Sequence, residues 1–499
     1  MSTHSPFFTP PPVAISRLLP ESFDLGRPAL GGEVVYDAQE QSYVVVGAGT
    51  NMWAGTDEGH LAARRLNGDG VVAARAAFVG TGGHAHRKLG ATFRSSPDGC
   101  SVHVSAVVHA DGLTSLQFRR EPGGPTHELV SSLVGADVMQ LERVGRRFVM
   151  RVARFGAPWV STVLEDGPEL GAETLAGVFV CSHEASVTER AVFHNVRVFR
   201  IAGPELRPYR DYLDSELELL NPESGYARVI WRQEGELQAP NWAPDGRSID
   251  CNRAGRILRL DLATGTMATV DTGLADRNNN DHVRSPDSAL IGLSHHTGEA
   301  GGGSRVFVVP TGGGEPRLVT TQGLSYLHGW SPDGSRLIYT AKRPETGTAL
   351  NIYRIPVEGG AEERLSDGPG LDDGSEYSPD GRWIYFNSNR SGVMKIWRMR
   401  PDGSGVEQVT HDEFNDWFPH VSPDGRRMAF ISYLPEVPAG DHPFYKQVYL
   451  RICELEDDTA RVEAPRVVAY VHGGQGSFNV PCWSPDGRVL AFVSNGGVG

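Results

Sequence analysis

A six-residue phrase returns through the second half of the chain, and its spacing constrains the fold more than any other feature. The phrase usually ends in Ser-Pro-Asp-Gly and occupies residues 241–246, 283–288, 329–334, 376–381, 420–425 and 482–487. The residue before each proline falls at positions 243, 285, 331, 378, 422 and 484, so successive copies are 42, 46, 47, 44 and 62 residues apart. A self-similar period of about 45 residues indicates a repeat architecture.

The phrase has the composition of a tight turn. Proline presets φ, aspartate closes the turn onto its own backbone, and glycine accepts a positive φ. Apolar runs follow the turns, for example at 383–387 and 428–432. Around the copy at 329–334 the sequence predicts four strands, at 326–331, 335–341, 351–355 and 363–365. Four strands at this period are typical of a β-propeller blade.

The two ends of the repeat region complement each other. Residues 217–220 and 227–231 are predicted to be third and fourth strands with no first and second strand before them. Residues 479–484 and 488–494 are predicted to be first and second strands with nothing after them. One blade completed by both ends would remove the exposed sheet edges of an open array. We therefore predict a six-bladed propeller over residues 215–499.

Composition and charge narrow the class of protein. The 499 residues include 60 glycines and 33 prolines in short alternating runs, which suits a multidomain, all-β chain. The five scattered cysteines form no Cys-x-x-Cys pair, which predicts free thiols in a reducing compartment. Residues 1–20 lack the pattern of a signal peptide, so we expect a cytoplasmic location. The net charge of −14 argues against a nucleic-acid partner, and we expect no membrane partner and no nucleotide or organic cofactor.

Residues 20–205 lack the repeat and predict a β-sandwich of the jelly-roll type. Strand patterns such as 33–36, 43–46, 102–105 and 191–198 alternate with glycine-rich turns, and no helical pattern is present. Residues 1–19 are predicted to be an N-terminal tail. Residues 206–214 are predicted to be a linker to the propeller.

This half resembles the concanavalin A-like/laminin G-like sandwich of a family found beside carbohydrate enzymes. The matching segments are 47–53 with Asp57 and His60, 68–70, 88–94 and 191–196. The resemblance implies a sandwich fold, and such domains often bind sugars. Trp53 is then predicted to stack on a sugar ring, with the alternative that it belongs to the core. The polar residues predicted to surround it on one concave face are Asp57, His60, Arg94 and Gln117.

The repeated Ser-Pro-Asp-Gly phrase makes residues 215–499 resemble the TolB-like/WD40-like (PD40) β-propeller family. The region is more loosely similar to oligogalacturonate lyases, propeller glycosidases and the propeller of prolyl oligopeptidases. The sequence has no Gly-x-Ser-x-Gly nucleophile elbow, which argues against peptidase activity.

The residues just before each turn are predicted to lie at one mouth of the propeller channel, because the first strand of each blade lines that channel. Here the repeats differ, and several carry imidazole or carboxylate groups. Paired carboxylates can act as general acid and base on a glycosidic bond. The candidate catalytic residues are Asp373, Glu376, Asp416, His328 and His420.

A metal site is the alternative use of these groups. His282, His328 and His420, together with Glu376, offer the imidazole and carboxylate ligands that suit Mn²⁺, Zn²⁺ or Fe²⁺, and Ca²⁺ is a further candidate. As the lyase resemblance implies, the metal would neutralise a uronate carboxylate for β-elimination. His282 and His328 lie three residues before the residue that precedes proline, whereas His420 and Glu376 lie two before it. Without a bulge in some strands, these groups cannot all point inward.

The remaining polar and aromatic residues at this mouth are predicted to bind the substrate. Those residues are Asn241, Asp281, Trp417, Arg390 and Asn479, with Trp53 from the sandwich. The proline-rich insertion at 435–446 is predicted to cover the mouth, and His442 within it is predicted to lie at the solvated surface.

Two hypotheses follow. The first is a carbohydrate-active enzyme, a glycoside hydrolase or an oligosaccharide lyase, that acts on imported oligosaccharides at the channel mouth. The second is a non-catalytic TolB-like binding scaffold that recognises a protein or a glycan. The variation of the polar residues between blades favours the first.

Overall fold

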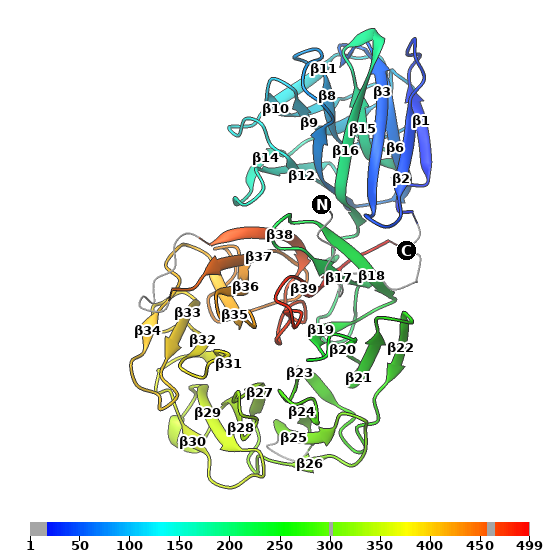
Figure 1. Cartoon of the computed structure of the whole chain (residues 1–499). Helices are drawn as coiled ribbons and strands as arrows, with labels where there is room; N and C mark the ends of the chain where they lie inside the picture. Colours follow the sequence, from blue (N-terminus) through cyan, green and yellow to red (C-terminus); the bar gives the residue numbers. More distant parts are fainter. Residues whose placement is uncertain (1–16, 299–302, 457–464, 499) are drawn as a thin grey trace. The chain divides into compact units, whose positions relative to one another are not determined.

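The computed structural model describes residues 17–298, 303–456 and 465–498, which form two units (Figure 1). One unit comprises the described residues up to 204 together with 496–498, and the other comprises the described residues of 205–495. Almost all regular structure within these ranges is β-strand, which confirms the all-β prediction. A single short 3-10 helix, η2, spans Pro344–Thr346 in the described part of the chain. No helix in the described part has the length and apolar character that a membrane span requires.

The N-terminal unit contains two seven-stranded antiparallel sheets and a small hairpin. The first sheet has the order β1 (Glu21–Leu25), β6 (Gly59–Asn67), β15 (Glu173–Cys181), β8 (Lys88–Arg94), β9 (His103–His109), β10 (Thr114–Arg119), β11 (Thr126–Val130). The second has the order β14 (Val160–Leu164), β13 (Arg147–Ala153), β12 (Val138–Val144), β7 (Gly70–Phe78), β16 (Glu184–Phe199), β3 (Ser42–Gly49), β2 (Glu33–Asp37). The hairpin pairs β4 (Met52–Trp53) with β5 (Thr56–Asp57).

One hydrophobic cluster joins the two sheets. Phe93 and Val104 of the first sheet and Val72 and Leu141 of the second all belong to it, and none of the four is exposed. Leu18 and Leu19, at the end of the predicted tail, are also part of this cluster. Residues 1–16 of that tail lie outside the described residues. The finer expectation of a concanavalin A-like jelly roll stays a prediction.

The second unit is a six-bladed propeller, as predicted. Its blades lie in a ring, with β19, β23, β27, β31 and β35 nearest the centre (Figure 1). Each of five blades is a four-stranded antiparallel sheet whose strands follow the chain from the centre outward. The first blade contains β19 (Gln238–Trp242), β20 (Ser248–Arg253), β21 (Arg256–Asp261) and β22 (Thr266–Thr269), and the second contains β23 (Asn278–Arg284), β24 (Leu290–His296), β25 (Ser304–Pro310) and β26 (Arg317–Leu318). The third contains β27 (Ser325–Trp330), β28 (Arg336–Ala341), β29 (Asn351–Pro356) and β30 (Glu363–Arg364), and the fourth contains β31 (Asp372–Tyr377), β32 (Ile384–Ser388), β33 (Lys395–Met399) and β34 (Glu407–Gln408). The fifth contains β35 (Asn415–Val421), β36 (Arg427–Tyr433), β37 (Lys446–Glu454) and β38 (Arg466–Gly473).

The sixth blade is built from both ends of the region, as predicted. Its sheet has the order β18 (Ala227–Gln233), β17 (Ser215–Leu220), β39 (Leu490–Asn495). Strand β17 pairs with β39 from Ser215 opposite Asn495 to Leu220 opposite Leu490. The innermost strand is reduced to an isolated bridge between Trp483 and Leu490. Pairing two strands that are far apart in the sequence closes the ring.

The repeated phrase forms the turn that its composition predicts. In the copy at 329–334, the Asp333 carboxylate accepts hydrogen bonds from the Ser331 hydroxyl (2.6 Å) and the Ser335 amide (3.0 Å), and Gly334 has a φ of 71°. The Ser331 hydroxyl also accepts the amide of Arg336 at 2.9 Å. Serine therefore joins both sides of the turn, which explains its recurrence as well as that of aspartate and glycine.

The copy at 283–288 ends in Ser288 instead of glycine, and Ser288 adopts a φ of 59°. A left-handed conformation costs a residue with a Cβ atom roughly 1 kcal/mol. We therefore expect Ser288→Gly to raise the free energy of unfolding of the propeller by about 0.5–1 kcal/mol, measured by chemical denaturation. The reciprocal change Gly334→Ser should lower it by a similar amount, and equal stabilities for Ser288→Gly and the original protein would contradict this account.

Candidate functional site

A pocket of 770 Å³ opens in the propeller beside the innermost strands. Many polar side chains line its wall, together with aromatic rings and the aliphatic side chains of Ala254, Leu350 and Leu371. Its lining residues are Tyr209, Tyr212, Glu236, Gln238, Asn252, Ala254, Gly255, Arg277, Asn278, Asn279, Asn280, Asp281, His296, Tyr326, His328, Thr340, Leu350, Leu371, Asp373, Phe418, Gly440, His442, Gln475 and Asn479. Of the residues predicted from the sequence, the pocket contains His328, Asp373, Asp281 and Asn479.

A bulge in each of the five innermost strands β19, β23, β27, β31 and β35 decides which of their side chains reach this pocket. The pairing register shifts between Gln238 and Asn241, Asn278 and His282, Leu327 and Gly329, Asp373 and Glu376, and Trp417 and His420. At three of the bulges one residue has a positive φ, namely Ala239 (53°), Gly374 (60°) and Phe418 (54°). An extra residue in one strand changes the face to which the following side chains point. The predicted site is therefore divided in two at the bulge.

The residues that lie at one fixed distance before each turn form a mostly polar ring. Five residues before the residue that precedes proline, the six repeats carry Gln238, Asn280, Tyr326, Asp373, Trp417 and Asn479. All of these except Trp417 line the pocket. Residues that lie two positions before the residue that precedes proline, including Asn241, Glu376 and His420, do not line the pocket. The sequence shows that these residues share one position in every repeat. Whether that position faces the pocket depends on the bulge.

His328 and Asp373 form an ion pair at the pocket wall. The His328 Nε2 atom lies 2.7 Å from Asp373 Oδ1, and the two side chains are 4% and 13% exposed. Burial opposes protonation of His328, but the charge of Asp373, its hydrogen bond and the charge of Asp281 together raise the pKa of His328. Burial likewise opposes ionisation of Asp373, but the charge and hydrogen bond of His328 lower the pKa of that carboxyl. The pair therefore favours an imidazolium beside a carboxylate.

Asp281 has the opposite electrostatic character. Burial, with a further contribution from the charge of Asp373, raises the pKa of Asp281 to about 6, although His328 and the hydrogen bond from Asn279 act against this rise. The Asn279 amide donates to Asp281 Oδ2 at 2.6 Å. The pocket thus holds one carboxyl with a raised pKa and one with a lowered pKa. Such divergence between two carboxyls is found where one acts as an acid and the other as a base.

The raised pKa of Asp281 predicts a pH-dependent stability change. The folded protein binds this proton more tightly than the unfolded chain does, so its stability falls as the pH rises from about 4 to about 6. Asp281→Asn removes the ionisation. We expect the variant to be more stable by about 1–2 kcal/mol above pH 6, less than the full value of a two-unit shift because the amide is also desolvated. Denaturation at pH 4 and pH 7.5 measures the difference, and an equal difference at both values would contradict the prediction.

Aromatic rings form another part of the wall. The rings of Trp417 and His442 lie 4.5 Å apart edge to face, and those of Phe418 and His442 lie 5.6 Å apart. Phe418, His442 and two tyrosines, Tyr209 and Tyr212, line the pocket. His442 was predicted to lie at the solvated surface, and the insertion at 435–446 instead brings it into the wall. The tyrosines come from residues 206–214, so this predicted linker also contributes to the site.

Glu376 and His420 form a contact of their own between neighbouring blades. Glu376 Oε2 lies 2.7 Å from His420 Nδ1, and Oε1 accepts the Val421 amide at 3.1 Å. The second ring nitrogen of His420 lies 3.1 Å from the Phe478 carbonyl oxygen. Both hydrogen-bonding ends of His420 are therefore used within the fold. The catalytic role predicted for this pair has no support from its position.

This arrangement makes a specific prediction for Glu376→Gln. The amide cannot accept from both His420 and Val421 as a carboxylate does, so we expect a loss of about 1.5 kcal/mol in the free energy of unfolding. The affinity of the pocket for its ligand should stay unchanged, because Glu376 lies outside the lining. Calorimetry would measure the stability and the ligand affinity. A variant with normal stability and lost binding would show that Glu376 belongs to the binding site.

Asp416, Trp417 and Arg390 are also held by structural contacts. Asp416 is fully buried, and its Oδ1 accepts from Arg451 Nη2 at 2.6 Å and from the Ser432 hydroxyl at 2.8 Å. Trp417 is fully buried in a hydrophobic cluster of the propeller. Arg390 donates to both carboxylate oxygens of Asp372 at 2.9 Å. Because of these contacts, the structure does not bring the three residues into the pocket.

The predicted three-histidine metal set is not assembled. His282 is fully buried, with Nδ1 3.0 Å from the Asn280 carbonyl oxygen, and both nitrogens of His420 face other partners. Asn241 bridges blades, since it donates to the Pro481 carbonyl oxygen and accepts the Arg284 amide. In the described ranges, the one group of three histidine, cysteine or carboxylate ligand atoms within 4.8 Å of one another lies in the N-terminal unit.

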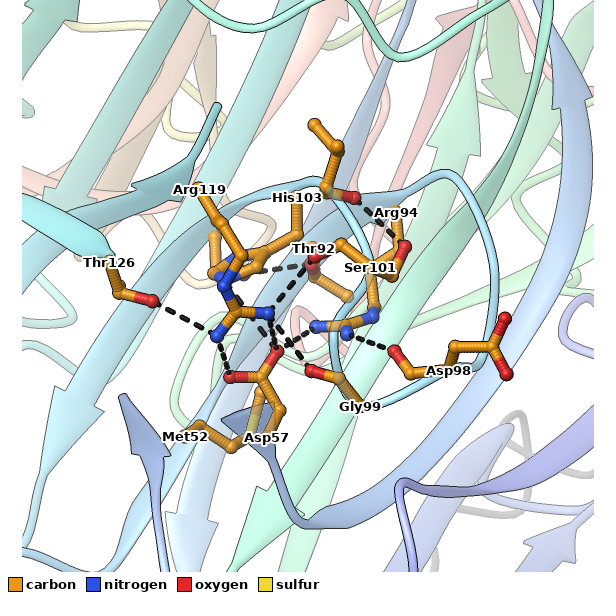
Figure 2. Close-up of polar contacts among 12 residues, drawn as sticks. Met52, Asp57, Thr92, Arg94, Asp98, Gly99, Ser101, His103, Arg119 and Thr126 are labelled. Carbon is orange, nitrogen blue, oxygen red and sulfur yellow. Dashed lines mark hydrogen bonds and ion pairs between the residues drawn. The ribbon is translucent and has the colours of Figure 1, made fainter. Parts of the chain in front are cut away.

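The predicted sugar-binding face of the N-terminal unit is closed. Figure 2 shows Asp57 between Arg94 and Arg119, and all three side chains are fully buried. His60 pairs in register with Val180, a residue of the core between the sheets, and so lies on the opposite face from Arg94. Trp53 is half-buried, with the Lys88 ammonium 5.9 Å from its ring centre. The predicted residues therefore do not share one open surface.

Comparisons with known proteins agree with the propeller. The profile of the TolB beta propeller domain (PD40) matches residues 328–436. The uncharacterized protein Atu1656 of Agrobacterium fabrum is 43% identical over 280 residues, which cover 56% of this chain and 92% of that protein. The solved structure of a putative TolB from Agrobacterium tumefaciens is 42% identical, covers 57% of this chain and 99% of that chain, and gives a TM-score of 0.53. A TolB homolog of Chlorobium luteolum is 32% identical over 128 residues, 24% of this chain and 27% of that protein.

Proposed function

Because the chain belongs to the TolB-like β-propeller family, we propose that its propeller is a binding scaffold whose pocket takes a neutral or amino sugar. The observation that carries the proposal is the ring of polar side chains at one offset, among them Gln238, Asn280, Asp373 and Asn479. Hydroxyl-rich ligands need convergent donors and acceptors beside apolar surface. Amide, carboxylate and tyrosine groups together with the Phe418 ring supply that combination.

The charge of the pocket argues for a neutral or cationic sugar over a uronate. Its lining contains three carboxyl groups, Glu236, Asp281 and Asp373, against the cations Arg277 and His328. Arg390, which was predicted to bind the substrate, is paired with Asp372 and lies outside the lining. An anionic uronate would meet like charges in a desolvated site. The lyase hypothesis therefore has less support than sugar binding.

A calorimetric titration with a panel of neutral, amino and uronic-acid oligosaccharides tests the proposal. We expect saturable binding of neutral or amino sugars and weaker binding of uronates. If no sugar of the panel binds, or if uronates bind most tightly, the proposal fails.

Hydrolysis of a glycosidic bond is the second candidate, favoured by the opposed pKa shifts of Asp281 and Asp373. Asp281 would act as the general acid and Asp373 would stay ionised. Release of reducing ends from the oligosaccharide that binds is the assay. Activity that survives in Asp281→Asn, or binding without any release, would remove this candidate and leave the scaffold.

We further propose that the N-terminal unit is a concanavalin A-like sandwich. Its two seven-stranded antiparallel sheets around one hydrophobic cluster support this assignment. The order of the strands in a solved structure, compared with that fold, is the test.

A further inference from the structure

A cluster of histidines lies at one end of the first sheet of the N-terminal unit, outside every site considered above. His84 and His86 precede β8, and His109 and Asp111 lie at the end of β9 and just after it. His183 lies between β15 and β16, and its ring stacks on that of His84 with 4.2 Å between centres. The rings of His86 and His109 are 5.7 Å apart.

We propose that His86, His109 and Asp111 bind a divalent transition-metal ion such as Zn²⁺. Each residue offers one ligand atom, and these atoms lie within 4.8 Å of one another. Two imidazoles and a carboxylate, with a fourth position open to water, are a common ligand set for zinc. The structure does not bring together in this way the metal ligands that the sequence predicted in the propeller.

The distances already approach those of a metal site. His86 Nδ1 and Asp111 Oδ2 are 3.4 Å apart. Zinc–ligand bonds of about 2.0–2.1 Å in a tetrahedron place neighbouring ligand atoms about 3.3 Å apart. The His86 side chain is 51% exposed and so has room to rotate toward the remaining ligand.

His109 supplies a second, independent observation. Its side chain is buried, with 7% of the residue exposed, and neither ring nitrogen has a hydrogen-bond partner among the described residues. A buried polar group without a partner is destabilising and calls for an explanation. A bound metal would satisfy one of its nitrogens.

Backbone hydrogen bonds hold the two ligand-bearing loops together without a metal. The Asp111 amide donates to the Ala85 carbonyl oxygen at 3.0 Å, and the Ala110 amide donates to that of Arg87 at 3.1 Å. The Leu113 amide donates to Asp111 Oδ1 at 3.0 Å, which leaves Oδ2 toward His86. The site is therefore preorganised, and binding needs little ordering of the backbone.

Lys88 is the group that opposes binding. It pairs in register with His109, and its ammonium donates to Asn51 Oδ1 at 2.7 Å and to the Met52 carbonyl oxygen at 3.0 Å. These contacts hold the Lys88 ammonium against the β4–β5 hairpin. The Asp111 carboxylate supplies the negative charge that balances part of the metal's charge.

Titration of the untagged, chelator-treated full chain with Zn²⁺ tests the proposal. We expect one ion per chain. His86→Ala and Asp111→Asn should each weaken binding at least about 100-fold, the upper end of the loss seen when only an outer-shell partner of a metal ligand is changed. Both side chains are exposed, so the metal-free melting temperature should not change. His127→Ala, which removes an exposed histidine of β11, is the matched control and should bind as the original protein does.

The visible spectrum of Co²⁺ in place of Zn²⁺ gives a readout of the ligands themselves. The original protein should show the intense bands of a four-coordinate ion, and His109→Gln should lose them. Absence of stoichiometric Zn²⁺ binding, or binding that His86→Ala and Asp111→Asn leave unchanged, would overturn the proposal.

Discussion

Asp373→Asn is expected to weaken sugar binding by about 100-fold, because two contributions to binding are lost together. The carboxylate of Asp373 lines the pocket and pairs with His328 at 2.7 Å. Hydrogen bonds from a ligand to a charged group contribute about 1.5–3 kcal/mol each, and a tenfold change in affinity corresponds to about 1.4 kcal/mol. The asparagine variant also removes the charge that contributes most to raising the pKa of His328, so the protonated imidazole is less favoured.

The control for this variant removes a carboxylate elsewhere in the propeller. Asp402 lies in an exposed turn, where its carboxylate accepts the amide of Ser404 at 3.0 Å. Asp402→Asn should bind the sugar as the original protein does. Calorimetric titration measures both variants, with a thermal melt to show that each is folded. Equal affinity in Asp373→Asn and the original protein would exclude Asp373 from the site.

Asp57→Asn is expected to destabilise the N-terminal unit by about 3–5 kcal/mol, the loss found when one partner of a buried ion pair is removed. The Asp57 carboxylate is fully buried and contacts Arg119 Nη2 at 2.7 Å and Arg94 Nη1 at 2.9 Å. His103 lies nearby, and burial lowers the pKa of His103 to about 3, so this ring is neutral. Asparagine would leave two buried guanidinium groups without a carboxylate between them (Figure 2).

Asp166→Asn is the matched control, because Asp166 pairs with Arg146 at 2.7 Å but is 74% exposed. An exposed pair contributes about 0–1 kcal/mol, so this variant should melt almost as the original protein does. Hydrogen exchange of the full chain assigns the change to a unit. Faster exchange is expected in peptides from residues 17–204 and not in those from 205–495, and unchanged exchange in both would contradict the role of Asp57.

The pH dependence of the Asp57 contribution follows from its pKa. Burial opposes ionisation, but the charges of Arg94 and Arg119 and the hydrogen bond from Arg119 lower the pKa of Asp57 below its ordinary value. The stabilisation is therefore present above the unfolded pKa near 4 and is lost as the pH falls through the folded value. The Asp57→Asn variant should lack this acid-dependent loss.

The propeller could be predicted from the sequence because the features that define it are short segments that repeat along the chain. The turn phrase fixes the hairpin, its spacing fixes the blade, and the incomplete ends of the region fix the closure by β17 and β39. The sequence did not predict which polar side chains share the pocket. That depends on a bulge in each of the five innermost strands, which places Asp373 in the wall and Glu376 between blades. The contribution of Tyr209 and His442 depends on loops that cross to the pocket, and no periodicity marks such loops.

The N-terminal unit shows a related limit of sequence patterns. Asp57, Arg94 and Gln117 are polar and belong to strands, and such residues were expected to face solvent and ligands. The structure buries all three: Asp57 pairs with Arg94 and Arg119 at once, and the Gln117 amide donates to the Ser115 hydroxyl. Burial of a charge depends on partners that are distant in the sequence. In contrast, the cluster of His86, His109 and Asp111 was not recognised from the sequence, since His86 is separated from the other two residues by β8 and β9.

A crystal structure of the protein with the oligosaccharide that binds most tightly in the titration tests the central claim most directly. The account predicts a sugar residue inside the propeller pocket, within hydrogen-bonding distance of Asp373 and of at least one of Asn280 and Asn479. A sugar bound elsewhere, such as against Trp53, with this pocket free of ligand, would contradict it.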